Sequence, residues 1–194
     1  MTVIGIYGWS EGRFDELSTE GRIEQAARAQ AIAVIAHRGQ KDKLGQPYIW
    51  HVTAVAGRFD PLDDTLACCA AWLHDLLEDT DITADDLLTA GIHEEVIEVV
   101  ELLTRRREMG DEYYERIARN EAARQVKRSD LFDNTHPSRT ELLDEATRSR
   151  LRAKYEHAFA AIGEQWPEHF NEDQIGGSQF GSRWLWEGRE EGRG

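Results

Sequence analysis

Apolar residues recur along most of this chain at the three- and four-residue spacing of an amphipathic helix. The clearest example begins at Val52, from which Val55, Ala56 and Phe59 follow at i+3, i+4 and i+7. The same spacing recurs in three further segments, residues 23–36, 66–77 and 96–103. No window of useful length alternates apolar with polar residues, as a half-buried strand would. The pattern therefore predicts an all-α fold.

Capping residues and helix breakers divide this pattern into separate helices. Ser18 can cap the first helix, Thr83 opens a short one through a capping box with Asp86, and Gly91 ends it. The basic run 105–107 suits the last turn of a helix, where cations interact favourably with the helix dipole. We therefore expect helices over residues 18–38, 48–59, 64–80, 83–91, 96–107, 111–133 and 139–166, with a lysine-bearing loop at 41–47.

The length of 194 residues and the hydrophobic share of 40% suit one domain with a substantial core. We expect this domain to occupy residues 18–170, between an N-terminal extension at 1–17 and a tail at 171–194. The tail is rich in glycine and charge, and it contains the large aromatic residues Phe180, Trp184 and Trp186. Because such side chains are costly to leave in water, we expect the tail to dock on the body or on a neighbour. The sequence leaves open whether the chain forms a homo-oligomer.

The charge balance narrows the class of partner. The 37 acidic and 23 basic residues give a net charge of −14. This argues against a general nucleic-acid surface, because phosphate backbones need a basic face. A small anionic substrate remains compatible with this charge, since a bound cation and a local group of Lys and Arg reverse the field within one cleft.

The cysteines and the N-terminus bear on location. Cys68 and Cys69 are adjacent within an apolar run, and we expect them to be small core residues of a protein in a reducing compartment. No segment approaches the roughly 18 apolar residues that span a bilayer, so no membrane is expected as a partner. Residues 1–16 lack the basic region that begins a signal peptide. The expected location is the cytoplasm.

Four polar residues interrupt the apolar frame of the segment WLHDLLEDT. On a continuous helix His74 and Glu78 lie one turn apart, and so do Asp75 and Asp79. His74 and Asp75 project about 100° apart around the helix axis, close enough to bind one ion from adjacent positions. Two ligands are too few, so a metal site also needs residues from other helices.

Two residues elsewhere in the chain could complete such a site. His51 lies in an otherwise apolar helix, and Asp130 follows an apolar face in the segment VKRSDLFDN. Two imidazoles and two carboxylates form a mixed nitrogen and oxygen site, which suits Mn²⁺, Fe²⁺ or Zn²⁺. Open coordination positions on such an ion let bound water ionise near neutral pH and attack phosphorus.

Each candidate also has an ordinary structural explanation when taken alone. A single histidine on an apolar helix, such as His51, is more often a hydrogen-bonded core residue than a ligand. Glu78 and Asp79 alone would be ordinary exposed acids. The order of His, then His-Asp, then Asp, each within an amphipathic helix, favours the metal site.

These residues carry a resemblance to a known family. The matching segments are AHRGQKDKLGQPYIWH (36–51), AWLHDLLEDTDIT (71–83) and VKRSDLFDN (126–134). The sequence resembles the HD-domain metal-dependent phosphohydrolases, and more narrowly the hydrolase domain of the RelA/SpoT stringent-response enzymes and the small alarmone hydrolases. The Glu-Asp pair after the His-Asp dipeptide is typical of this narrower branch. The resemblance implies an HD-domain helical bundle with a metal site between its helices.

The resemblance also implies a role for each matching position. The metal ligands would be His51, His74, Asp75 and Asp130, with Mn²⁺ as the preferred ion and Fe²⁺ or Zn²⁺ as alternatives. The catalytic pair, acting on the metal-bound water, would be Glu78 and Asp79. The substrate would be a small anionic nucleotide, in contact with Arg38, Lys41, Lys43, Tyr48 and Asn134.

The implied activity is removal of the 3′-diphosphate of (p)ppGpp with release of pyrophosphate. The sequence departs from the relatives at Trp50 and Val52, on either side of the histidine, and at Ser129, before the last aspartate. These departures concern substrate choice and leave the metal ligands in place. Three alternatives therefore stay open: an NADPH 2′-phosphatase, a deoxynucleotide phosphohydrolase, and a non-catalytic module that binds a nucleotide or a protein partner.

Overall fold

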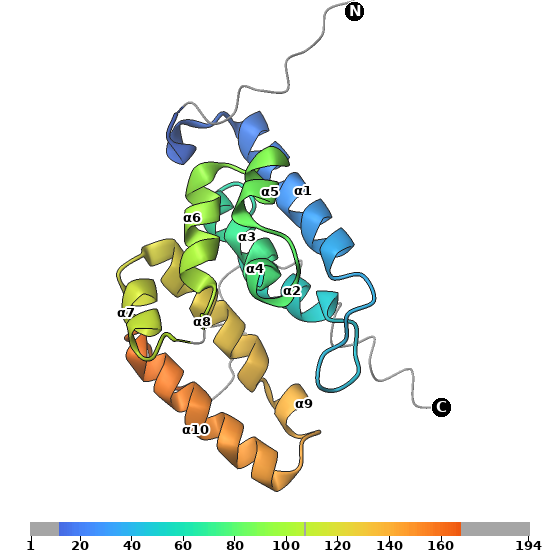
Figure 1. Ribbon diagram of the computed structural model, residues 1–194. Coiled ribbons are helices and arrows are strands. Elements are labelled where there is room, and N and C mark those ends of the chain that lie inside the picture. The colour runs from blue at the N-terminus through green and yellow to red at the C-terminus, as the bar shows by residue number, and fades with distance from the viewer. Residues whose placement is uncertain (1–11, 107, 168–194) are drawn as a thin grey trace, which may run out of the picture.

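The computed structural model describes residues 12–106 and 108–167, and this part of the chain is helical (Figure 1). A 3₁₀ helix, η1, covers Phe14–Glu16. The α-helices are α1 (Thr19–Ala36), α2 (Ile49–Ala56), α3 (Thr65–Leu73), α4 (Leu76–Asp79), α5 (Ala84–Thr89), α6 (Glu94–Leu103), α7 (Glu112–Ala118), α8 (Glu121–Thr135), α9 (Pro137–Thr140) and α10 (Glu145–Ala161). Within the described residues the β pairing is limited to one bridge, between Lys41 and Pro47. The all-α prediction is confirmed, whereas the tail at 171–194 lies outside the described residues and the domain limits stay a prediction.

Helix α3 lies at the centre of the bundle, in contact with α1, α2, α6 and α8 (Figure 1). Its sequence is apolar on every side, as expected of a helix surrounded by others, and Leu73 and Cys69 are fully buried. The expectation that Cys68 and Cys69 are core residues is confirmed, because both are buried and unpaired. Burial raises the pKa of the Cys68 thiol to about 11, so the thiol stays protonated at neutral pH.

The predicted caps are present where the structure describes them. The Ser18 hydroxyl accepts a hydrogen bond from the Gly21 amide, and Thr83 and Asp86 form a reciprocal capping box at the start of α5. Gly91, after α5, adopts a φ of 82°, in the left-handed region that favours glycine. These local signals therefore set helix ends in the way that the sequence predicts.

Three helix boundaries differ from the expectation. The helix predicted at 48–59 ends at Ala56, with Gly57 as its C-cap. The helix predicted at 96–107 ends at Leu103, because Thr104 has an extended backbone. The prediction that the basic residues lie in its last turn is therefore wrong for Arg105 and Arg106, the two that the structure describes. The stretch 111–133 is two helices, since Asn120 leaves the helical conformation and caps α8 by accepting from the Ala123 amide.

The stretch 139–166 is also divided. Short α9 starts at Pro137, and Asp144 then caps α10 by accepting from the Thr147 amide. The turn between the two helices places α10 alongside α8 (Figure 1). This packing brings the α10 side chains to the cluster described below.

The most consequential difference lies at His74 and Asp75, where the predicted continuous helix is broken. The helix α3 ends at Leu73, and α4 begins at Leu76 after Asp75, whose φ of −101° and ψ of 0° are not helical. The His74 imidazole hydrogen-bonds the Ala71 carbonyl oxygen at 2.8 Å, in competition with the backbone of the next turn. Only Asp75 leaves the helical conformation, since His74 keeps helical dihedral angles and the Asp79 amide still donates to the Asp75 carbonyl oxygen at 2.9 Å. The break therefore lies between the two proposed ligands, and the predicted i, i+4 spacing of Asp75 and Asp79 is kept on α4.

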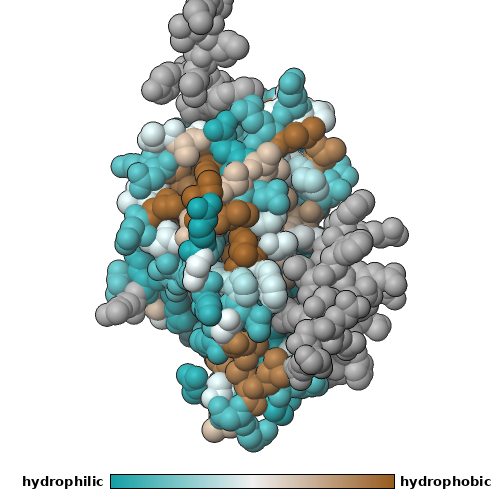
Figure 2. Space-filling model, turned by 90° about the vertical axis from the view of Figure 1, so that its right-hand side faces the viewer, coloured by the Kyte–Doolittle hydropathy of each residue, from teal (hydrophilic) through white to brown (hydrophobic). Residues whose placement is uncertain are grey.

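The face that carries α1 is mostly hydrophilic, with scattered hydrophobic residues (Figure 2). On α1 the exposed large hydrophobic side chains are Ile23, Val34 and Ile35. Among the helices of the described segments, none combines the length and apolar character needed to cross a membrane.

Candidate metal centre and substrate pocket

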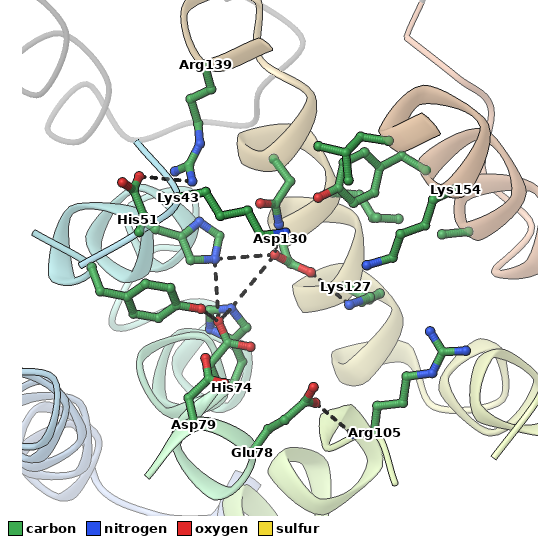
Figure 3. A pocket seen from close by; sticks show the side chains of 18 of the residues that line it. Lys43, His51, His74, Glu78, Asp79, Arg105, Lys127, Asp130, Arg139 and Lys154 are labelled. Atoms are coloured by element: carbon green, nitrogen blue, oxygen red, sulfur yellow. Dashed lines mark hydrogen bonds and ion pairs between the residues drawn. The ribbon is translucent and has the colours of Figure 1, made fainter. Parts of the chain in front are cut away.

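Four side chains from three parts of the fold converge on one point, and Figure 3 labels three of them, His51, His74 and Asp130. His51 comes from α2, Asp130 from α8, and His74 and Asp75 from the break between α3 and α4. His51 Nε2 is 3.5 Å from Asp75 Oδ2 and 3.4 Å from Asp130 Oδ1. His74 Nε2 is 2.9 Å from Asp75 Oδ2 and 3.9 Å from Asp130 Oδ1. The sequence-predicted ligand set is therefore assembled around one small volume.

The far nitrogen of each imidazole is already engaged. His51 Nδ1 pairs with Asp133 Oδ2 at 2.7 Å, and His74 Nδ1 with the Ala71 carbonyl oxygen at 2.8 Å. A ring whose Nδ1–H donates in this way presents the lone pair of Nε2 on its other side. Both Nε2 atoms consequently face the point where the carboxylates meet.

The donor set fits a divalent cation. His74 Nε2 is buried and lies 2.9 Å from Asp75 Oδ2 without the geometry of a regular hydrogen bond, an arrangement that is unfavourable unless another group occupies the position it faces. Ligand atoms that share one ion at about 2.1 Å lie about 3–3.5 Å apart, close to the separations between the imidazoles and carboxylates here. One ligand atom from each of His51, His74 and Asp130 lies within 4.8 Å of the other two, close enough to share an ion. Asp75 adds a fourth oxygen, 2.9 Å from His74 Nε2.

The two carboxylates are held in place by neighbours on opposite sides. Asp75 Oδ2 accepts a hydrogen bond from the Tyr48 hydroxyl at 2.5 Å. Asp130 accepts from Lys127 Nζ at 2.8 Å and from the Asn134 amide at 2.5 Å. Burial opposes the ionisation of both acids, but His74 for Asp75 and Lys127 for Asp130 hold each pKa well below its usual range. Both groups are therefore anionic and able to bind a cation.

The same charges act on the histidines. Burial opposes the charged form of His51, yet its hydrogen bonds with Asp130 and Asp133 raise the pKa of the imidazole well above the usual value. Burial also opposes a charge on His74, and Asp75 raises the pKa of that ring. Without a metal ion the cluster therefore binds protons in the place where a cation would bind.

We expect Mn²⁺ binding to weaken as the pH falls from about 8 to about 6, because a metal ion must displace protons from His51 and His74. For each imidazole proton that the metal ion must displace, the dissociation constant of the metal rises by up to about tenfold for every pH unit below the imidazole pKa. Calorimetric titration in buffers of different ionisation enthalpy measures both the affinity and the protons released. An affinity independent of pH over this range would contradict the assignment of the two histidines as ligands.

Two further acids, Glu78 and Asp79, border the cluster on α4 (Figure 3). Glu78 Oε2 accepts a hydrogen bond from the Arg105 backbone amide at 2.9 Å, which fixes the segment after α6 beside α4. Partial burial, together with the nearby charge of Asp75, raises the pKa of both carboxyl groups. A carboxyl group whose pKa is raised in this way holds a proton more readily than a free acid, which suits it to acid–base chemistry.

A cavity of about 430 Å³ opens over this cluster. Its lining includes several cations, of which Figure 3 labels Lys43, Arg105, Lys127, Arg139 and Lys154. Burial lowers the pKa of Lys154, and the positive charges of Lys127 and Lys43 lower it further. Cations brought this close to one another favour an anionic occupant, so the acidic chain has a locally basic pocket.

Tyrosines hold part of this basic wall. The Tyr113 hydroxyl donates to the Leu103 carbonyl oxygen at 2.7 Å, at the point where α6 ends. The Arg105 guanidinium lies 5.5 Å from the Tyr113 ring centre, and Lys127 Nζ lies 5.6 Å from it. These cation–π contacts orient both cations toward the cavity.

The predicted substrate-binding residues divide into two groups. Lys41, Lys43, Tyr48 and Asn134 line the cavity. Arg38 is exposed and is not among the lining residues. The structure thus gathers four of these five side chains around the candidate metal centre.

Several lining or supporting residues were not singled out from the sequence: Asp42, Arg105, Tyr113, Lys127, Asp133, Arg139 and Lys154. Arg105 was interpreted as part of a helix end. Asp133 and Lys127 flank Asp130 at +3 and −3, a helical spacing that places them on the same side of α8. That spacing was the available signal; Lys154 and Arg139 offered none, because their helices meet the site only through tertiary packing.

The fold and the site define a class of protein: an α-helical domain in which His and Asp side chains from separate helices form a candidate metal centre. The family model of the HD domain matches residues 29–131, more than half of the chain. The chain therefore belongs to the HD domain family, and the resemblance seen in the sequence is confirmed.

Similar curated proteins are long enzymes of guanosine polyphosphate metabolism. A guanosine-3′,5′-bis(diphosphate) 3′-pyrophosphohydrolase of Vibrio cholerae is 41% identical over 73 residues, which are 37% of this chain and 10% of the relative. A protein of the same name from Aquifex aeolicus is 40% identical over 83 residues, 42% of this chain and 12% of the relative. A GTP pyrophosphokinase of Streptomyces coelicolor is 42% identical over 66 residues, 34% of this chain and 8% of the relative. The chain thus spans about a tenth of the length of these relatives.

A solved structure described as a metazoan ortholog of SpoT that hydrolyzes ppGpp has a similar fold. The TM-score is 0.59 at 20% identity, and the match covers 71% of this chain and 85% of that one. At this identity the likeness supports the helical fold.

Proposed function

We propose that this chain is a divalent-metal-dependent phosphohydrolase that removes the 3′-diphosphate of (p)ppGpp, yielding GDP or GTP and pyrophosphate. The observation that carries the proposal is the convergence of two imidazoles and two carboxylates beneath a cation-lined pocket, with two further acids at its border. The names of the curated relatives support the substrate, although they describe much longer proteins.

The proposed ligands are His51, His74, Asp75 and Asp130. When bound, a divalent ion such as Mn²⁺ supplies Lewis acidity and lowers the pKa of water that it coordinates. Mn²⁺ is preferred on family resemblance, and Fe²⁺ or Zn²⁺ also suits this donor set. The hydrogen bonds to Asp133 and to the Ala71 carbonyl keep both Nε2 atoms directed at the ion position.

Glu78 and Asp79 are the proposed proton-transfer groups. In the net reaction an oxygen of water bonds to the phosphorus attached to ribose O3′, the bond from that phosphorus to O3′ breaks, and O3′ takes up a proton. One carboxylate accepts the proton that water loses, and the raised pKa of the pair allows a proton to be returned to O3′. The Arg105 amide holds Glu78 in position for this role.

Phosphate groups of the substrate would lie against Lys43, Arg105, Lys127 and Lys154, with Lys41 at the rim. Each of these residues lines the same cavity as the proposed ligands. A nucleotide bearing diphosphates places several negative charges there, and the clustered cations stabilise them in a site partly shielded from water. Tyr48 and Asn134 are proposed to contact the nucleotide next to Asp75 and Asp130. A nucleotide substrate and unpaired thiols agree with a cytoplasmic location.

We expect the wild-type protein with Mn²⁺ to convert ppGpp to GDP and pyrophosphate, and to lose this activity by at least about a hundredfold after chelation. Ion-exchange chromatography of the nucleotides and an enzymatic pyrophosphate assay measure the two products. NADPH and deoxynucleotides are tested in the same panel.

The outcomes of this panel separate the alternatives. Cleavage of NADPH or a deoxynucleotide while ppGpp stays intact would replace the proposed substrate and retain the hydrolase. Failure to bind Mn²⁺ together with failure to cleave any nucleotide would favour a non-catalytic module. A return of ppGpp hydrolysis on adding Mn²⁺ back serves as the control for damage by the chelator.

A further inference from the structure

The loop between Lys41 and Pro47 is organised around a single carboxylate, that of Asp42. Asp42 Oδ1 accepts hydrogen bonds from the Leu44 and Gln46 amides, each at 2.9 Å. The Asp42 amide in turn donates to the Gln46 carbonyl oxygen, also at 2.9 Å. Lys41 and Lys43 flank this aspartate and both line the cavity. The position of Asp42 therefore decides where the two lysines lie.

The other oxygen of Asp42 is connected to the candidate metal centre through Arg139. One guanidinium nitrogen of Arg139 lies 3.3 Å from Asp42 Oδ2, and the other donates to Asp133 Oδ2 at 2.7 Å. That Asp133 oxygen also pairs with His51 Nδ1 at 2.7 Å. A continuous chain of charged contacts thus runs from the loop to a proposed metal ligand.

These charged contacts between the loop and His51 are shielded from water. The side chains of Asp133, Asp42 and Arg139 are 1%, 8% and 14% exposed. Surface ion pairs contribute little, whereas a planar guanidinium that bridges two buried carboxylates is strongly orienting. Arg139 can bridge them because short α9, after Pro137, turns its side chain back toward the loop and α8.

We propose that Arg139 is a positioning residue that couples the lysine-bearing loop 41–47 to the proposed metal ligand His51. Through Asp133 it holds the His51 imidazole with Nε2 toward the ion position, and through Asp42 it holds Lys41 and Lys43 beside the phosphates. The inference rests on the proposed metal-ligand role of His51. It adds a structural connection between the proposed metal centre and the lysine-bearing loop 41–47, which goes beyond the assignment of the metal ligands.

The substitution Arg139→Gln tests this link. A purely electrostatic role of Arg139 and a positioning role predict opposite changes in the affinity for Mn²⁺. Removing a positive charge near the cluster strengthens cation binding if Arg139 acts only through its field. Losing the orientation of Asp133 and His51 weakens binding, and we expect the dissociation constant to rise about tenfold. Isothermal titration calorimetry at a fixed pH measures this constant.

The loop is followed separately, by hydrogen exchange of the Leu44 and Gln46 amides in the metal-free protein. We expect exchange to become at least about tenfold faster in Arg139→Gln, because Asp42 loses its anchor. At saturating Mn²⁺ the KM for the nucleotide should rise more than kcat falls, because the lysines lose their position while Glu78 and Asp79 keep theirs.

Two further variants make the test decisive. Arg139→Lys keeps the charge but cannot bridge both carboxylates, so it should retain only part of the loop protection and Mn²⁺ affinity. The matched control Arg119→Gln removes an exposed arginine whose partner, Glu115, lies 3.6 Å away, and should leave both readouts unchanged.

Mn²⁺ binding in Arg139→Gln as tight as in the wild type, or tighter, would overturn the proposal, and so would unchanged loop exchange. A wild type that binds no Mn²⁺ would also overturn it, by removing the role of His51. A wild type that binds Mn²⁺ without cleaving ppGpp would refute the substrate alone. In that case weaker Mn²⁺ binding and faster loop exchange in Arg139→Gln would still support the link.

Discussion

The His74→Ala variant is expected to lose saturable Mn²⁺ binding and to hydrolyse ppGpp at least about a thousandfold more slowly than the wild type. His74 Nε2 is a buried imidazole nitrogen that faces the cluster, 2.9 Å from Asp75 Oδ2. Its removal takes one of two nitrogen donors from the proposed ion, whose stabilisation of charge is worth several kcal/mol. Calorimetric Mn²⁺ titration and initial-rate measurements check the two effects.

A control is available in His93, another buried histidine, which caps the start of α6. His93 packs against Phe14 and accepts from the Glu95 amide, away from the cavity. His93→Gln should lower thermal stability while leaving Mn²⁺ binding in place, which separates loss of the site from loss of the fold. Mn²⁺ binding and turnover in folded His74→Ala at wild-type levels would refute the ligand assignment.

The double variant Glu78→Gln/Asp79→Asn is expected to bind Mn²⁺ and to lower kcat by about 10²–10⁴-fold, the range that proton transfer by a positioned side chain supplies. Both amides keep the volume of the acids but cannot take a proton. The side-chain carbonyl oxygen introduced by Glu78→Gln can still accept from the Arg105 amide, so the segment after α6 should stay anchored. Single-turnover kinetics at saturating Mn²⁺ isolate the chemical step.

The control for this variant must remove the same charge elsewhere. Glu98 and Glu101 are exposed acids on α6, and Glu98→Gln/Glu101→Gln changes the net charge equally. This control should keep wild-type turnover. If kcat is retained in Glu78→Gln/Asp79→Asn, the proposed proton-transfer role of the pair is wrong, whatever the metal content.

Two of the positions where this chain departs from the relatives, Val52 and Ser129, have structural roles. Val52 is fully buried in α2, one residue after His51. The Ser129 hydroxyl donates to the Val55 carbonyl oxygen at 2.9 Å, joining α8 to α2 next to the cluster. Both residues therefore act on the placement of the proposed ligands through packing, and neither lines the cavity. We therefore expect substrate choice to depend on the cations and tyrosines that line the pocket.

The sequence by itself determined the all-α class and most helix starts, because helical periodicity and caps are local properties. Ser18, Thr83 and Gly91 act on backbone groups a few residues away, so their effect can be read without knowing the rest of the fold. The candidate ligands could also be named from the sequence, because the order of His, then His-Asp, then Asp carries the resemblance to the HD family.

Only the tertiary structure decided how these residues meet and what surrounds them. The break at His74–Asp75 escaped the periodicity because the apolar positions continue across it, while a side chain takes over a backbone carbonyl. Lys154 and Arg139 resemble solvated charges in the sequence and become pocket residues because α9 and α10 fold back along α8. Pairing between distant charges depends on which helices pack together, and that is settled by the core as a whole.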